Sequence, residues 1–419
     1  MQTSPLQRAY HYSWLSLILL YPIIFFITPA RSVVLLWLPL LAGWRWLAHG
    51  RPIPKTPYNP AILLLTLMVA VSAVVTPDFV FSLPKIAGLL FGIATFYVVL
   101  DVNRLAEQQV GTVGVLLLLC GVFTLIGFAN FYPPIAFRLP AALRLEVNPN
   151  EVSGILTYSL PLLLALTVWQ FQQQGKTAGQ AQFMHALLAG VMSIASLIGL
   201  LILYLTTSRG GQVACLVAAG LIAVLCTRRF RLLMAGVAVV LLIAVGVYFA
   251  QVDSAETTQA HANATLQITL TNRIELWSRG VMGIQDFPLT GMGMNLFRRV
   301  MPTLYPLEGV SAEEDLAHAH NHLLQAALDL GLPGLFAYLA LWVFSALQLT
   351  RVWHNTTQPQ LRFLALGLGA SLLAHFLFGM TDAIALGAKP GFLLWILFGL
   401  AAALPAYAAT ETTGEIFVS

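Results

Sequence analysis

The chain has 419 residues, of which 58% are hydrophobic and 9% are charged, and its formal net charge is +4. Soluble globular proteins carry about 25% charged residues, so this composition excludes a soluble protein. The apolar stretches are numerous and continuous, which excludes a single anchor and an alternating β-barrel. A membrane helix needs about 20 apolar residues, so the chain has room for roughly a dozen of them and one or two large loops.

Hydropathy predicts twelve membrane spans in chain order. They cover residues 12–29, 31–48, 60–76, 85–101, 109–129, 152–170, 183–206, 211–226, 231–250, 332–350, 361–380 and 391–409. The predicted fold is therefore an all-α polytopic membrane protein. It divides into helices 1 to 9 in residues 1–250, a long loop in residues 251–331, and helices 10 to 12 with a short tail in residues 332–419.

The basic residues predict how these spans are oriented, because short cytoplasmic loops are enriched in Lys and Arg. With a cytoplasmic N-terminus, eleven of the 21 basic residues fall inside and ten outside. Four of the outer ten belong to the long loop, and long loops cross the membrane largely regardless of charge. The remaining count of eleven against six predicts that both termini are cytoplasmic and that the long loop lies outside.

The long outer loop, residues 251–331, is predicted to be ordered and functional. It begins with a polar stretch, continues with an amphipathic segment over residues 272–285 and ends in an apolar run over residues 318–331. Loops of this length in compact proteins are usually functional or disordered, and the aromatic and aliphatic residues here favour order. We expect short helices in this loop, one of them capped by Asn272.

Arg209 lies in the short joint between the seventh and eighth spans, at the outer membrane boundary. A cation is expensive there unless it is paired or reaches the interface with its long side chain. Gly210 and Gly211 follow it, and glycines allow a backbone to approach a ligand closely. Arg209 is therefore a candidate anion-binding residue, with an interfacial anchor as the alternative.

Arg273 follows the expected cap Asn272 at the start of the amphipathic segment. A guanidinium and the free backbone N–H groups of a helix N-terminus can together hold a phosphate. The alternative is a surface arginine paired with Glu275 or Glu256. Arg279 lies six residues further along, about 240° around a helix, so only one of the two arginines is expected to line a given site.

Three histidines, His318, His320 and His322, stand close together near the end of the long loop. The apolar spacing that follows predicts a helix that starts with Asn321 as its cap and ends at Gly331. His320 would then lie on a loop, where a neutral imidazole can act as a general base. Three histidine ligands would require an extended chain, so no metal is predicted. A solvated histidine cluster is the remaining alternative.

Other polar residues of the outer face complete the candidate set. Asp382 lies at the outer end of the eleventh span, where carboxylates are often functional, and its alternative role is to pair with Lys389 or a histidine. Asn150 opens the sixth span and Arg144 precedes it. Helix capping or loop solvation is the alternative for both.

One outer face thus offers arginines, a histidine and a membrane surface. Arginines can stabilise a pyrophosphate leaving group, and a base can deprotonate an acceptor hydroxyl. This combination suffices for glycosyl transfer from a lipid diphosphate, and direct displacement would invert the configuration of the anomeric carbon. A small-anion transporter is the alternative, because twelve spans suit that class. Transporters, however, usually carry charged or broken helices at mid-membrane.

Five segments stand out in order along the chain. They are SRGG at 208–211, NRIELW at 272–277, FPLTGMGMNLF at 287–297, HAHNHLLQAALDLGLPGL at 318–335 and the Thr-Asp pair at 381–382. Together they resemble the O-antigen ligase and O-antigen polymerase superfamily. The resemblance covers roughly residues 145–385, and its most specific part is His320-Asn321 followed by an apolar helix.

The resemblance implies a GT-C-like, metal-independent, inverting glycosyltransferase without cofactors, located in the bacterial inner membrane with its site on the periplasmic side. The implied donor is a glycan linked to undecaprenyl pyrophosphate, held by Arg209 and Arg273, and the implied base is His320. We prefer the ligase branch, which transfers to the lipid A core oligosaccharide, over the polymerase branch, which extends the lipid-linked glycan. Supporting roles are expected for His318, Asn321, Asp382, Asn150 and Arg144.

Overall fold

The structure is a computed structural model that describes residues 5–26, 33–103, 109–136, 147–226, 262–307 and 317–413. Every regular element in these ranges is helical. Eight helices are long and apolar enough to cross a membrane, which confirms an all-α polytopic membrane fold. They are α5 (Phe79–Val102), α6 (Gln109–Phe131), α8 (Pro149–Gln174), α9 (Gly179–Leu205), α10 (Arg209–Cys226), α14 (His322–Asn355), α15 (Pro359–Gly379) and α16 (Phe392–Thr413).

The first three predicted spans correspond to shorter apolar helices, namely α2 (Leu15–Phe26), α3 (Val34–His49) and α4 (Asn59–Val75). The ninth predicted span, residues 231–250, lies outside the described residues. Two predicted helices are joined in α14, which begins at His322 and bends at Gly331, where φ is 71°. The bend separates the short helix predicted between Asn321 and Gly331 from the tenth predicted span.

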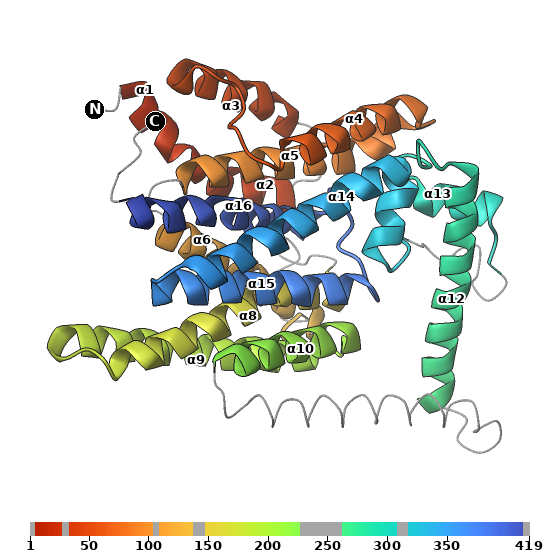
Figure 1. Ribbon diagram of the computed structural model, residues 1–419. Helices are drawn as coiled ribbons and strands as arrows, with labels where there is room; N and C mark the ends of the chain where they lie inside the picture. Colours follow the sequence, from red (N-terminus) through yellow and green to blue (C-terminus); the bar gives the residue numbers. More distant parts are fainter. Residues whose placement is uncertain are drawn as a thin grey trace.

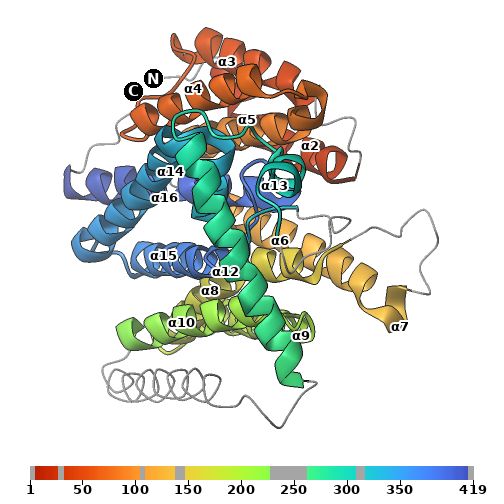
Figure 2. The same ribbon diagram turned by 90° about the vertical axis from the view of Figure 1, so that its right-hand side faces the viewer.

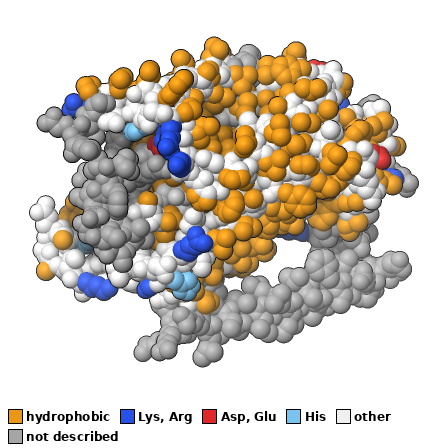
Figure 3. Space-filling model, turned by 45° about the horizontal axis from the view of Figure 1, so that its top comes forward, with side chains coloured by type: hydrophobic (Ala, Val, Ile, Leu, Met, Phe, Trp, Pro, Cys, Tyr) orange, Lys and Arg blue, Asp and Glu red, His pale blue; other side chains and the backbone are white. Residues whose placement is uncertain are grey.

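The long helices lie side by side in a bundle (Figure 1). α15 packs against α8 and α10, α14 packs against α4, and α16 packs against α5. Glycines let some of these helices approach closely: a Cβ on Gly367 of α15 would lie only 2.8 Å from the Leu162 side chain of α8. Hydrophobic side chains cover much of the outer surface (Figure 3), as a lipid-facing surface requires.

Most candidate residues lie at one end of this bundle, on the right in Figure 1. The helices α5, α8, α10 and α14 begin there and α15 ends there, and we call it the site end. The short helix α1 (Pro5–His11) and the last turns of α16 lie at the opposite end (Figure 1).

The helix α12 (Ala262–Asp286) lies crosswise over the site end (Figures 1 and 2). The predicted cap at Asn272 is wrong, because α12 begins at Ala262 and has 25 residues, whereas the amphipathic segment was predicted over residues 272–285. Residues 262–271 contain neither proline nor glycine, so the chain offers nothing to stop the helix from extending. The next helix, α13 (Phe297–Leu304), contains only eight residues.

The segment between α15 and α16 runs into the bundle without helical structure until η5 (Lys389–Gly391). The side chains of Ala383, Ile384 and Leu386 are buried. Gly387 has a φ of 77°, and its backbone packs directly against the backbone of Lys85 in α5. Irregular backbone within a membrane protein is tolerated where the protein itself surrounds it. This segment places Asp382 at the site end.

Candidate active site

The start of α14 fixes the position of the histidines. The side chain of Asn321 accepts hydrogen bonds from the backbone N–H groups of Leu323 and Leu324, both at 3.0 Å. The predicted helix cap is therefore confirmed. The Asn321 amide also donates to the carbonyl of Met380 at 3.3 Å, which ties the histidine loop, residues 318–320, to the segment that carries Asp382.

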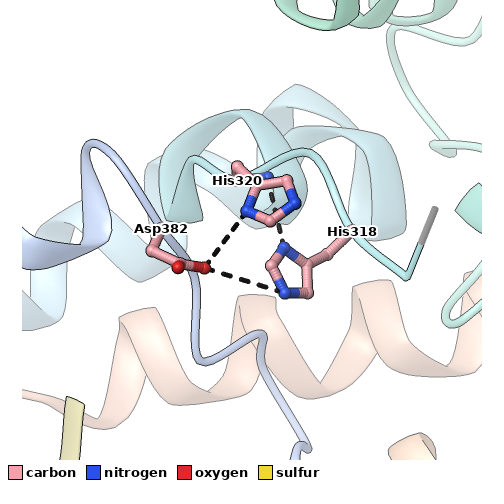
Figure 4. A group of neighbouring side chains, drawn as sticks. All are labelled: His318, His320 and Asp382. Carbon is pink, nitrogen blue, oxygen red and sulfur yellow. Dashed lines mark hydrogen bonds and ion pairs between the residues drawn. The ribbon is translucent and has the colours of Figure 1, made fainter. Parts of the chain in front are cut away.

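The histidine loop and Asp382 form one cluster (Figure 4). His320 Nδ1 lies 3.2 Å from Asp382 Oδ1, and His318 Nε2 lies 3.9 Å from the same oxygen. His318 Nδ1 accepts a hydrogen bond from the backbone N–H of His320 at 3.2 Å. The proton of a neutral His318 is therefore on Nε2, pointing towards the carboxylate. His320 keeps Nε2 as the ring nitrogen that remains for a substrate.

Burial shapes the charges of this cluster. It lowers the pKa of His318 to about 3; His320, Lys85 and Arg298 act electrostatically in the same direction, and the charge of Asp382 opposes them. Burial alone would raise the pKa of Asp382, but the hydrogen bond and electrostatic effect of His320 and the hydrogen bond from the backbone N–H of Ala383 lower it below its usual range. The cluster therefore combines a neutral His318 with an ionised Asp382 that faces His320.

The same three side chains offer a set of metal ligands, since their ligand atoms all lie within 4.8 Å of one another. Two imidazoles and one carboxylate are a donor set that transition metals accept. The sequence offered only the neighbouring histidines as metal ligands. Pairing of Asp382 with a histidine was expected as an alternative role, and here Asp382 lies beside two of them. His322, the third histidine of that group, is buried on α14 and bonds the Tyr338 hydroxyl at 3.0 Å.

Arg209 is the first residue of α10 and is exposed at the site end. The two glycines that follow it do not form an open cradle. Gly210 packs against the side chain of Thr381, and a Cβ on Gly211 would lie 3.2 Å from Cβ of Ser153 in α8. The glycines thus bring the start of α10 against the residue that precedes Asp382, and Arg209 lies beside this contact.

Arg273 belongs to the face of α12 that meets the histidine loop. Four residues later, the indole N–H of Trp277 donates to the carbonyl of Ala319 at 2.9 Å, and residues four apart share one helix face. Arg273 is half-buried on this face. Arg279 lies on a different face, where its guanidinium reaches Met282 Sδ at 3.9 Å.

The start of α8, which carries the candidate Asn150, is fixed by a helix cap. Asn148 caps the helix by accepting from the backbone N–H of Asn150 at 2.9 Å, so Asn150 is a residue of the first turn. A Cβ on Gly154 would lie 2.9 Å from Phe378, which places this turn against the end of α15. Arg144 lies outside the described residues.

Three helices thus begin around residues 378–384. Gly154 of α8 contacts Phe378, Gly210 of α10 contacts Thr381, and His322 of α14 contacts Gly379. Each helix N-terminus carries a partial positive charge and unpaired backbone donors. The sequence signals indicate each helix start separately. That the three starts lie close together is decided by the packing of the helices.

One comparison with known proteins found a match to part of the chain. The family model of the O-antigen ligases matches residues 194–339, a segment that runs from α9 into α14 and contains Arg209, Arg273 and His320. Asp382 lies beyond it. A comparison with curated proteins found no match.

Proposed function

We propose that this chain is an O-antigen ligase of the O-antigen ligase and polymerase superfamily, a proposal supported by the match of the ligase family model to residues 194–339. It is an inverting glycosyltransferase that moves a glycan from undecaprenyl pyrophosphate to a hydroxyl of the lipid A core oligosaccharide. The observation that carries this proposal is the contact between His320 Nδ1 and Asp382 Oδ1 at 3.2 Å, on a loop beside Arg209 and the Arg273 face of α12.

His320 is the proposed base. Asp382 holds the imidazole through Nδ1 and stabilises the positive charge that develops when Nε2 takes a proton, the role that a buried carboxylate plays beside a catalytic histidine. The acceptor hydroxyl loses its proton to Nε2, and its oxygen forms the new bond to the anomeric carbon. His318 and Asn321 support this geometry through their hydrogen bonds within the loop and to Met380.

The donor pyrophosphate is the proposed leaving group. As the new bond forms, the bond between the anomeric carbon and the phosphate oxygen breaks, and the electron pair leaves with undecaprenyl pyrophosphate. Arg209, Arg273 and the N-termini of α10 and α14 supply positive charge for this anion. Attack opposite the leaving group inverts the anomeric configuration. No step uses a metal.

The proposed setting is the bacterial inner membrane. Both termini then lie in the cytoplasm and the site end faces the periplasm, where a lipid-linked donor can reach it by lateral diffusion. The charge count of the short loops supports this orientation.

A purified transfer assay tests the base assignment. His320→Ala should abolish transfer between lipid-linked donor and core acceptor, because general-base catalysis contributes about 100- to 10,000-fold. His185→Ala, at a histidine that bonds Gln170 in α8, is the control and should retain activity. A chelator should leave the wild-type rate unchanged. Wild-type turnover by the His320 variant would refute the assignment.

Complementation of a deletion strain tests the reaction type. Loss of a ligase leaves bare core and polymer on the carrier lipid, which a lipopolysaccharide gel resolves. Core that carries at most one repeat would identify a polymerase instead. Normal glycans with altered anion uptake would favour transport.

A further inference from the structure

The residue between the two site histidines is held on both sides. The backbone N–H of Ala319 donates to Gln325 Oε1 at 2.8 Å, and its carbonyl accepts from the Trp277 indole at 2.9 Å. Ala319 itself is fully buried. Side chains from α14 and α12 thus clamp the backbone of the histidine loop from two directions.

The amide of Gln325 is itself held in one orientation. Its Nε2 donates to Asp329 Oδ1 at 2.9 Å, one helical turn further along α14, and both side chains are buried. Because the carboxylate accepts the NH₂ group, the amide oxygen must face Ala319. The backbone of Asn295 also hydrogen-bonds this carboxylate, and Lys85 acts on it electrostatically. Asp329 therefore decides which end of Gln325 reaches the loop.

The clamp acts on a strained residue. His320 has a φ of 50°, a left-handed conformation that residues other than glycine rarely adopt. Such a conformation persists only where the surroundings enforce it. A loop released from the clamp would relax at His320 and move its imidazole away from Asp382.

We propose that Gln325 and Trp277 are positioning residues for His320, and that Asp329 orients Gln325 for this task. The inference rests on the proposed function, in which His320 is the base. Trp277 adds a link to the donor side, because it shares a face of α12 with Arg273. The clamp therefore holds the histidine loop at a fixed position relative to α12, the helix that carries Arg273.

A polarity swap tests the Gln325–Asp329 pair. Gln325→Glu sets two carboxylates against each other. Asp329→Asn leaves a single amide oxygen for two donors, the Gln325 NH₂ group and the backbone N–H of Asn295, so one of them loses its acceptor. The double variant restores the chain of bonds, since the carboxylate introduced by Gln325→Glu accepts from both the Ala319 N–H and the amide introduced by Asp329→Asn. Each single variant should lose about 10- to 100-fold in kcat, with the donor KM unchanged, and the double variant should recover most of this loss.

Trp277→Phe tests the other side of the clamp, since phenylalanine keeps an aromatic ring and loses the N–H donor. Its kcat should fall by a similar factor. Trp169→Phe is the matched control, because the Trp169 indole has no hydrogen-bond partner among the described residues. Melting temperatures identify any variant that is simply misfolded.

Hydrogen exchange at residues 318–321 reports the clamp without any need for turnover. The single variants should exchange faster there than the wild type, and the double variant should regain protection. Unchanged exchange, faster exchange with unchanged kcat, or a folded double variant that does not recover would each overturn the inference. A wild type that protects the loop but transfers no glycan would refute the proposed function instead.

Discussion

At the scale of single residues, strained backbone conformations occur in and around the candidate site. Among the described residues other than glycine, those with a positive φ are Thr207 (56°), Asn295 (66°) and His320 (50°). His320 is the proposed base, and Thr207 lies two residues before Arg209. Asn295 hydrogen-bonds the carbonyl of Phe81 at 2.9 Å, next to the start of α5. Backbone strain clusters at functional sites, and here it lies within the joints of the site end.

The buried His318 should make the protein less stable in acid. Burial lowers its pKa to about 3, whereas a histidine in the unfolded chain titrates near pKa 6.5. Between these values the unfolded chain binds a proton that the folded loop does not, so stability falls as the pH drops below about 6.5. The loss amounts to at most about 1.4 kcal/mol for each pH unit.

His318→Asn removes this titration and keeps an acceptor near the position of Nδ1. Melting temperatures between pH 7.5 and pH 5 should therefore fall less steeply for the variant than for the wild type. The other histidines contribute equally to both proteins. Parallel curves would show that His318 titrates alike in the folded and the unfolded chain.

At the scale of elements, α12 determines which arginine meets the histidines. Gly280 and Gly283 let it approach α14, since a Cβ on Gly280 would lie only 2.9 Å from Leu324 Cδ2 and one on Gly283 would lie 3.2 Å from Leu328 Cδ2. With this contact fixed, Trp277 reaches the carbonyl of Ala319. Arg273 shares the face of Trp277, and Arg279 does not.

Arg273→Ala and Arg279→Ala form a matched pair on this helix. Arg273→Ala should raise the donor KM by at least about 10-fold, because a hydrogen bond to a charged group contributes about 1.5 to 3 kcal/mol. Arg279→Ala should stay close to the wild type. Initial rates at increasing donor concentration measure both. Equal effects would mean that α12 contributes only general positive charge.

At the scale of the whole molecule, successive helices run in opposite directions, so that the joints that carry the candidate residues lie at one end. The joints after α4, α9 and α15 and the start of α14 all lie at the site end. The joints after α3, α8 and α14 lie at the opposite end and carry Arg51, Lys55 and Lys176. This division underlies the proposed orientation.

Cysteine labelling tests that orientation. Leu289→Cys lies in the long loop at a position whose side chain is 68% exposed, and Lys176→Cys lies in the joint between α8 and α9 at an exposed position. A membrane-impermeant maleimide should label the first in spheroplasts and the second only after lysis. Native Cys120 and Cys215 are buried, and the half-buried Cys226 is replaced by serine as background. The reverse pattern would invert the orientation.

Features that depend only on residues adjacent in the sequence could be predicted without the structure. Continuous apolar runs determine the membrane helices. The side chain of Asn321 caps the start of α14, and Gly331 allows its bend. Sequence reasoning failed at the start of α12, because nothing in the local sequence marks Ala262 as a boundary.

Which of the candidate residues meet depends on the packing of the helices. Asp382 reaches His320 across 62 positions of sequence, since the packing of α15 against α8 and α10 and the turn after it set where this carboxylate lies. The same packing brings together three helix starts, and the contact of α12 with α14 selects Arg273 and Trp277. Local rules set where helices begin and end, but contacts between distant segments depend on side-chain packing that no short stretch of sequence encodes.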